Sequence, residues 1–337
     1  MTMNDNKIDI LCATYNGERF VDKQIKSLVT QSRDLMQKDG YDIRLIIRDD
    51  GSTDKTMDIV RKRLDYYKAK RENPIEIKIL DDNYRTGSPT DSFIKLLNVS
   101  TGDYILFSDQ DDMWYRGKTD ETFALMRNYE AKYGKDTPIL VHTDLALMNE
   151  EGRKIADSFF DYQKLPREEG VRDSISSLLI QNTVTGCTVM MNRAAVELLK
   201  EAPASEMLLM YDHFAAILVA ATGKIAFLDK PLIRYRQHSG NAVGAHQAGS
   251  VSEYKSRFNL GRDKFLKDMD LSYRQAGYIL KRYEDRIREA SGQKTVDMMR
   301  EYSELIMAGK REKLEFFQKY GVYKNGAIKK LVQMIWC

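Results

Sequence analysis

Apolar positions in the first 110 residues alternate between short runs and helical spacings. Short apolar runs or alternations typical of buried strands occur at 8–13, 45–47, 75–79 and 104–107. Between them, apolar residues recur at intervals of three and four, which indicates amphipathic helices near 20–29, 57–64 and 93–97. Regular alternation of strands and helices predicts a parallel sheet with helices on both faces.

The pattern becomes less regular after residue 130. Strands are expected at 139–141, 184–191, 225–227 and 232–235, and helices near 193–200 and 207–221. Because these strands do not alternate with helices one by one, we expect the sheet to become mixed. Helical spacings at 276–287 and 298–305 predict helices in a charged C-terminal part. The sequence therefore predicts an α/β domain over residues 1–250 and a helical region over residues 251–337.

Composition adds limits on the class of protein. The chain is 42% hydrophobic and 31% charged, as expected for a domain with a sizeable core. Its net charge of +3 argues against a dedicated nucleic-acid binder. No run of 18 apolar residues and no N-terminal signal region is present, and the three cysteines lack metal-ligand spacing. These features predict a cytoplasmic protein.

Polar clusters follow three of the predicted strands: 14–16, 49–50 and 109–112. Ligands of parallel sheets bind where the strands end, so these clusters are candidates for a site. Three aspartates within the four positions 109–112 repel one another unless a cation gathers there. Mg²⁺ or Mn²⁺ prefers such carboxylates, with phosphate oxygens completing its shell. The alternative is that these aspartates only form a turn after the strand.

The first strand is followed by neither a dinucleotide-binding nor a P-loop glycine pattern. The chain instead carries, in order, ATYNGERF (13–20), RDDGSTD (48–54), GDYILFSDQDDMW (102–114), TGCTVMMNRAA (185–195), YDHF (211–214) and YRQHSGNAVG (235–244). Across residues 8–244 this series resembles the family-2 glycosyltransferases, which have the nucleotide-binding A-type fold. The DQDDMW form looks most like bacterial enzymes of polysaccharide assembly, many of them described as rhamnosyltransferases. The resemblance implies a metal-dependent, inverting transferase with a Rossmann-like mixed sheet.

The resemblance assigns nucleotide binding to three residues. Ala13 and Tyr15 match the positions that hold the nucleobase, and Tyr15 can stack on it. Asp50 matches the carboxylate that accepts the base's imide N–H, which favours a UDP- or dTDP-linked sugar because cytosine lacks that proton. The alternative is that Asp49 and Asp50 only form a turn and cap the next helix.

The resemblance also implies a site for Mg²⁺ or Mn²⁺. Asp111 matches the direct metal ligand, and Asp109 matches the member of the aspartate pair that faces the ribose or the metal. His238 matches a late histidine that reaches the metal or the diphosphate. Arg236 is a candidate for neutralising the leaving diphosphate, and a surface arginine is the alternative.

Asp212 matches the family's catalytic base, which takes the proton of the acceptor hydroxyl. The surrounding segment LLMYDHFAAIL is otherwise apolar. A carboxylate is unfavourable in such surroundings unless it has a function, which supports that role. The alternative is a helix N-terminal carboxylate stabilised by the helix dipole. The neighbouring His213 is a candidate for binding the acceptor.

The QxxRW motif of processive synthases is absent, and RYRQHSGN stands in its place. We therefore expect transfer of a single sugar to a growing glycan on lipid or protein. The donor would be dTDP-rhamnose, or a UDP-linked hexose or N-acetylhexosamine. Two other classes of protein are alternatives. A nucleotidyltransferase needs a Gly-rich basic loop that this chain lacks, and the intact set of candidate residues argues against a non-catalytic assembly protein.

The last fourteen residues, KNGAIKKLVQMIWC, form an amphipathic pattern. Its apolar stripe and neighbouring lysines are Ile328, Leu331, Val332, Ile335, Lys324, Lys329 and Lys330. Such a helix suits the surface of a membrane, with its lysines at anionic headgroups. The alternative is a terminal helix that packs on the catalytic domain or on a second subunit of a homo-oligomer.

Overall fold

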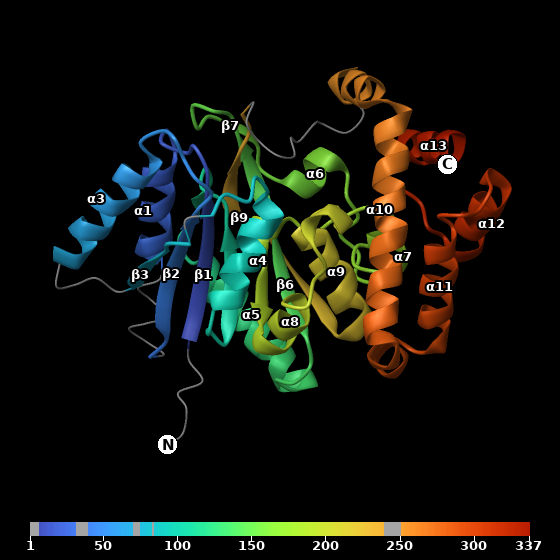
Figure 1. Cartoon of the computed structure of the whole chain (residues 1–337), viewed down its shortest axis with the longest axis horizontal. Coiled ribbons are helices and arrows are strands. Elements are labelled where there is room, and N and C mark those ends of the chain that lie inside the picture. The colour runs from blue at the N-terminus through green and yellow to red at the C-terminus, as the bar shows by residue number, and fades with distance from the viewer. Residues whose placement is uncertain (1–6, 32–39, 70–74, 83, 239–250) are drawn as a thin grey trace. The chain divides into compact units, whose positions relative to one another are not determined.

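The computed structural model describes residues 7–31, 40–69, 75–82, 84–238 and 251–337 (Figure 1). The chain forms two compact units, which are described separately. The first comprises Met1–Phe159, Thr185–Lys200 and Ala226–Ala242, and the second comprises Phe160–Val184, Glu201–Ile225 and Val243–Cys337. Two segments that precede residue 250 thus group with the C-terminal helices.

A parallel sheet opens the first unit, as the sequence predicts. Its strands are β1 (Lys7–Thr14), β2 (Asp42–Asp49), β3 (Glu76–Leu80) and β4 (Tyr104–Ser108). The spatial order is β3-β2-β1-β4, and all three pairings are parallel. Thr14 pairs with Asp49, and Cys12 pairs with Ser108. The carboxyl ends of β1, β2 and β4 therefore meet at one edge of the sheet.

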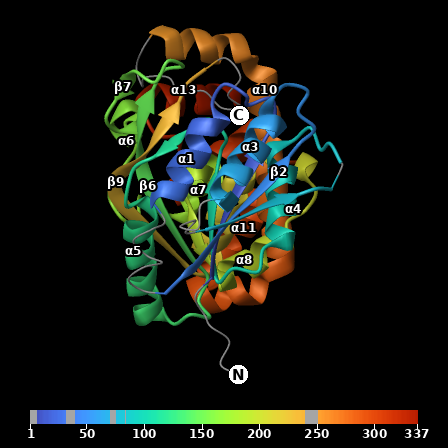
Figure 2. The same cartoon turned by 90° about the vertical axis from the view of Figure 1, so that its left-hand side faces the viewer.

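Helices cover both faces of this parallel part. The helices are α1 (Val21–Gln31), α3 (Thr56–Ala69) and α4 (Pro89–Val99). The connections from β1 to β2 and from β2 to β3 run in one direction across the sheet, and the connection from β3 to β4 runs back. Because such crossovers are right-handed, α1 and α3 lie on one face and α4 on the other (Figure 2).

The sheet continues with antiparallel strands, so the expected mixed sheet is confirmed. They are β5 (Met113–Trp114), β6 (Ile139–Met148), β7 (Lys154–Ala156), β8 (Met190–Asn192) and β9 (Lys224–Arg236). From β4 the order is β8-β6-β9-β5, and β7 pairs with β6. The same unit contains α5 (Lys118–Tyr133) and α8 (Arg193–Leu199).

One strand prediction was partly wrong, and two predicted strands are parts of a single strand. The stretch 184–191 is a strand only from Met190, because η1 (Gly186–Thr188) forms a turn in which Val189 N–H donates to Gly186 O. Its residues are buried, and a buried turn has the same apolar composition as a strand. The strands expected at 225–227 and 232–235 are one continuous strand, β9.

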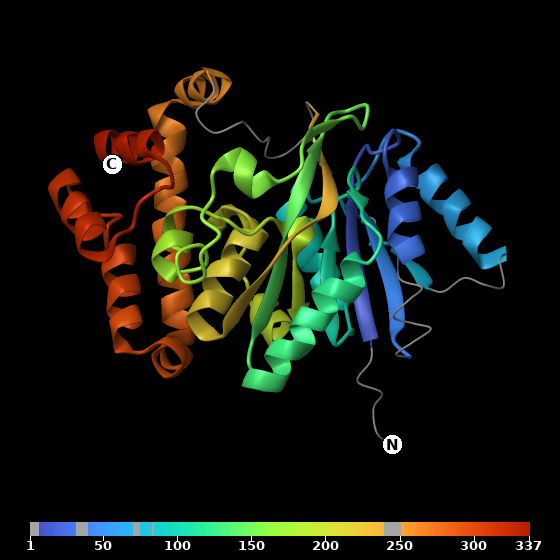
Figure 3. The ribbon, with the colours of Figure 1, turned by 180° about the vertical axis from the view of Figure 1, so that it is seen from behind.

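The second unit is helical. Its helices are α7 (Ile175–Ile180), η2 (Ser205–Met207), α9 (Tyr211–Thr222), α10 (Val251–Ser291), α11 (Gln293–Glu304), α12 (Lys310–Tyr320) and α13 (Ala327–Trp336), and α6 (Phe159–Gln163) leads into it. Figure 3 shows α10 and α11 side by side, and buried Tyr273 and Tyr302 stack edge to face between them. Gly261 interrupts α10 with a φ of 74°. Within the described residues, no helix combines the length and apolar character needed to cross a membrane.

Candidate functional site

The two aspartates after β2 point to different partners. Asp49 forms the turn: its Oδ1 accepts a hydrogen bond from Thr14 Oγ1 at 2.9 Å, and its Oδ2 accepts one from Ser52 N at 2.8 Å. Asp50 makes no such turn contact and is directed toward the loop before α4. The turn-forming alternative therefore describes Asp49, and Asp50 is left for another role.

Asp50 lies in a dense set of hydrogen-bond donors. Its Oδ1 accepts from Arg48 Nη1 at 2.8 Å and from Thr86 N at 2.6 Å, and its Oδ2 accepts from Gly87 N at 2.7 Å. Burial alone would raise the pKa of this carboxyl, but the bonds from Arg48, Thr86 and Gly87 outweigh burial and lower it. Asp50 is therefore held as a carboxylate that can accept further hydrogen bonds.

The predicted base-stacking residue lies beside the same loop. Tyr15 is 40% exposed, and the guanidinium of Arg85 lies 4.9 Å from the centre of its ring. Arg85 Nη2 also donates to Tyr15 Oη at 2.6 Å. Ala13, at the end of β1, pairs with Arg48. Ala13, Tyr15 and Asp50 thus lie on adjoining strand ends, as expected of a shared site.

Gln110 joins the turn of residues 109–112 after β4, here called the aspartate turn, to the loop after β1. Its side chain accepts from Tyr15 N at 2.9 Å and donates to Tyr15 O at 2.8 Å, so both polar groups of the amide are used. Gly17 allows this approach, because a Cβ there would lie 2.1 Å from Gln110 Oε1. The two loops are therefore fixed to each other by one side chain.

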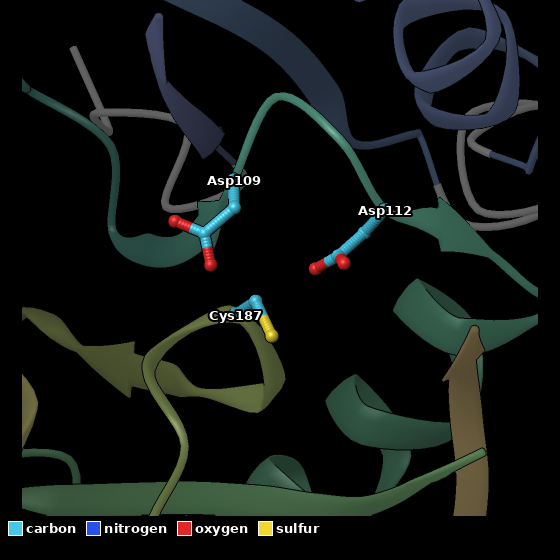
Figure 4. A group of neighbouring side chains, drawn as sticks. All are labelled: Asp109, Asp112 and Cys187. Atoms are coloured by element: carbon cyan, nitrogen blue, oxygen red, sulfur yellow. The ribbon is translucent and has the colours of Figure 1, made fainter. Parts of the chain in front are cut away.

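The aspartate turn gathers negative charge in a buried place. Ligand atoms of Asp109, Asp112 and Cys187 lie within 4.8 Å of one another (Figure 4). Asp112 Oδ1 accepts from Arg236 N at 3.1 Å, whereas its Oδ2 has no hydrogen-bond partner among the described residues. Burial raises the pKa of Asp112 well above its ordinary value, and the charges of Asp111 and Asp109 raise it further. A divalent cation would relieve this repulsion.

The structure brings Asp111 and His238, two of the predicted metal ligands, into contact. His238 Nε2 lies 2.6 Å from Asp111 Oδ2, and its ring lies 5.1 Å from that of Phe20. Oxygen and imidazole ligands both suit Mn²⁺, and carboxylates suit Mg²⁺. Cys187 is the unsuitable member of the cluster, because burial and then Asp112 raise the pKa of its thiol well above normal. The donor set fits a hard divalent cation held by carboxylates.

Arg236 is buried rather than on the surface. Its Nε donates to Asp111 O at 2.8 Å and its Nη1 donates to Glu150 O at 2.7 Å. Its guanidinium lies 4.7 Å from the ring centre of Phe20. These contacts tie the aspartate turn to the turn after β6. Its role toward the diphosphate stays a prediction.

Asp212 belongs to the second unit, in the first turn of α9. Its Oδ1 accepts from Asn182 Nδ2 at 3.1 Å, and Asn182 Oδ1 accepts from Val184 N at 2.9 Å. The second bond fixes which way the Asn182 amide faces. His213 is buried against Leu178 O, and burial lowers its pKa to about 4, so its ring is neutral at pH 7. The preceding segment therefore orients the candidate base.

Two residues that contact candidate residues were not predicted: Arg85, which contacts Tyr15, and Asn182, which contacts Asp212. Each is brought to its partner by the tertiary fold of its own unit, and nothing in its local sequence indicates the contact. Gln110 and Asp112 lie within the predicted cluster 109–112, but no individual role was predicted for them.

Known proteins resemble this chain in both sequence and fold. Residues 9–166 match the profile described as glycosyl transferase family 2. The dTDP-rhamnosyl transferase RfbG of Shigella flexneri is 28% identical over 76% of this chain and 80% of its own length. The poly(ribitol-phosphate) beta-glucosyltransferase of Bacillus spizizenii is 39% identical, over 32% of this chain and 15% of its own.

A solved structure supports the fold alone. TarS 1–349 of S. aureus, determined in complex with UDP, superposes with a TM-score of 0.53 at 15% identity, over 98% of this chain and 78% of that one. The match confirms the expected A-type α/β fold. Residues 9–166 thus resemble the family-2 glycosyltransferases, and the Shigella relative extends the sequence similarity over 76% of the chain.

Proposed function

We propose that this enzyme is an inverting, non-processive transferase of bacterial glycan assembly. It moves a sugar from a UDP- or dTDP-linked donor to a hydroxyl of a growing glycan on lipid or protein. The main observation in support is that Tyr15, Asp50 and the aspartate turn lie at adjoining strand ends of one sheet. The name of the Shigella relative makes dTDP-rhamnose the first donor to test.

The proposed roles follow from the contacts of each residue. Tyr15 stacks on the base, and Asp50 accepts its imide N–H. Asp109, Asp111 and His238 would hold Mg²⁺ or Mn²⁺, which when bound stabilises the negative charge of the departing diphosphate. Arg236 adds positive charge next to that turn.

Asp212 acts as the general base in this proposal. Its carboxylate takes the proton of the acceptor hydroxyl as the oxygen attacks C1 of the sugar, and the bond from C1 to the diphosphate breaks. Asn182 Nδ2 donates to Oδ1 of this carboxylate and so orients it. One displacement at C1 inverts its configuration.

A donor screen tests this function. We expect Mn²⁺- or Mg²⁺-dependent release of nucleoside diphosphate from dTDP-rhamnose or a UDP-sugar, and none from GDP-mannose. Chelation by EDTA should stop the reaction, and added Mn²⁺ should restore it. Turnover of a nucleoside triphosphate with a sugar phosphate would instead support nucleotide-sugar synthesis.

Asp50→Asn is expected to weaken UDP binding about tenfold or more, because hydrogen bonds to a charged group contribute roughly 1.5–3 kcal/mol. The preference for UDP over CDP should fall with it. Calorimetry with both nucleotides measures the change. Asp82→Asn is the matched control, because it also removes a carboxylate from Arg48 but has no proposed contact with the base. Unchanged UDP affinity in Asp50→Asn would exclude the assigned role.

Gln110→Ala is expected to weaken UDP binding by about tenfold, because two hydrogen bonds that fix Tyr15 are lost. Gly17→Ala should also weaken binding, since the new Cβ collides with Gln110. The shortened side chain of Gln110→Ala removes the collision. In that background, Gly17→Ala should therefore reduce UDP affinity much less. Calorimetry on the four proteins gives the coupling. Equal effects of Gly17→Ala in both backgrounds would refute the steric explanation.

We also place the enzyme in the cytoplasm, where nucleotide sugars are made, with residues 1–250 as the catalytic domain. A lipid-linked acceptor would bring it to the inner face of the cell membrane. We propose that the helical region 251–337 attaches the enzyme to this membrane surface.

A further inference from the structure

Helix α13 turns its apolar side outward. Ile328, Leu331 and Ile335 are 43%, 53% and 55% exposed, although they share one side of the helix. The buried residues of the helix are polar: Lys329 and Gln333. A terminal helix that packs by its apolar face would show the reverse arrangement.

Specific contacts hold α13 in this orientation. Gln333 Nε2 donates to Val322 O at 2.9 Å, and Gln333 Oε1 accepts from Lys324 N at 2.9 Å. Trp336 stacks edge to face on Phe265, with ring centres 5.7 Å apart. The polar face of α13 forms its hydrogen bonds within the protein. Its exposed apolar face can therefore contact a binding partner.

An exposed methionine lies near one end of this face, and two exposed lysines, Lys310 and Lys330, lie beside it. Met307, in the loop before α12, is 89% exposed, and Lys310 Nζ donates to Ile335 O at 2.6 Å, which brings this loop to the end of α13. Residues 307–337 contain seven lysines and arginines against two glutamates. Lys330 is exposed beside the stripe, with its Nζ 3.7 Å from the ring centre of Tyr323.

We propose that this face docks on an anionic lipid bilayer. Ile328, Leu331, Ile335 and Met307 enter the boundary between headgroups and acyl chains, and the exposed Lys310 and Lys330 meet the lipid phosphates. A second copy of the chain fits less well. A ten-residue helix is about 15 Å long. It supplies only a fraction of the roughly 800 Å² per partner that stable interfaces bury. Face-to-face pairing would also oppose two basic surfaces.

The same helix connects to the candidate base. Asn325 N, in the turn before α13, donates to Gln181 Oε1 at 2.9 Å. The next residue, Asn182, holds Asp212. The turn before α13 is therefore linked through the neighbouring residues Gln181 and Asn182 to Asp212, the proposed base. The inference extends the proposed lipid-linked acceptor, and it is tested below without turnover.

Co-sedimentation of the full chain with vesicles tests the docking face. We expect binding to vesicles of phosphatidylcholine mixed with phosphatidylglycerol, weaker binding to phosphatidylcholine alone, and release by salt. Leu331→Ser with Ile335→Ser should reduce binding on the order of tenfold or more, because two half-exposed apolar side chains are removed. Ile155→Ser with Val171→Ser is the matched control, since these residues are also exposed, at 44% and 43%. That control should bind like the unaltered chain.

Calorimetry with UDP accompanies each protein, so that loss of vesicle binding is separated from loss of the nucleotide site. Equal vesicle binding by the Leu331/Ile335 variant and the unaltered chain would overturn the proposed face. Absence of binding by the unaltered chain would overturn the membrane as partner. Self-association that the Leu331/Ile335 variant abolishes, without any vesicle binding, would identify a second copy as the occupant instead.

Discussion

Asp212→Asn is expected to reduce sugar transfer by roughly 10²–10⁴-fold while nucleotide affinity stays nearly unchanged, because a general base contributes about that factor to the rate. The asparagine side chain has the same size and can still accept the bond from Asn182. Steady-state transfer rates at saturating donor, together with calorimetry for UDP, separate the two effects.

Two further variants sharpen this test. Asn182→Ala should reduce transfer less than Asp212→Asn, because it removes only the group that orients the base. Asp161→Asn is a control in the same unit, where an exposed carboxylate pairs with Arg167. It should leave transfer unaltered. Reduced nucleotide affinity with normal saturated turnover in Asp212→Asn would assign Asp212 to binding and not to catalysis.

Asp111→Asn is expected to abolish metal-dependent transfer, with a loss well above the 10–100-fold that even outer-shell partners of a metal typically cost. The fold should persist, since the exchange lowers the repulsion within the aspartate turn. His238 loses its charged neighbour at the same time. Activity measured against Mn²⁺ and Mg²⁺ concentration, with thermal unfolding as the check on folding, gives the result.

Asp103→Asn is the control that shows whether removing any one carboxylate near β4 is enough to abolish metal-dependent transfer. Asp103 accepts from Lys7 N at the opposite end of β4, away from the aspartate turn. Its variant should keep the metal dependence of the unaltered enzyme. Near-normal turnover of Asp111→Asn with either cation would show that Asp111 is not a metal ligand.

Hydrophobic periodicity predicted the parallel half of the fold because each strand there is buried and each helix has one apolar face. It failed at 184–191, where a buried turn has the composition of a strand. It also divided β9 in two, because the exposed middle of that strand, including Asp229 and Lys230, resembles a loop. Local composition reports burial in both places and not backbone conformation.

The candidate site shows the same limit. Asp50, Asp111 and His238 could be named from short motifs, since each motif carries its own chemistry. The contacts of Asp50 with Thr86 and Gly87 depend on a loop thirty-six residues away, and those of Asp212 depend on Asn182. Such partners are brought together only by the tertiary fold. The amphipathic pattern of α13 was visible in the sequence, but which face is buried was not.

We propose above all that the edge formed by Tyr15, Asp50 and the aspartate turn binds a pyrimidine nucleoside diphosphate together with a divalent cation. Calorimetric titration of the full chain with UDP and with dTDP, each in Mn²⁺ and in EDTA, tests it most directly. We expect binding of at least one nucleotide that is strong in Mn²⁺, weak in EDTA, and reduced by Asp50→Asn. Binding of neither nucleotide in Mn²⁺, or equal binding in EDTA, would contradict the account.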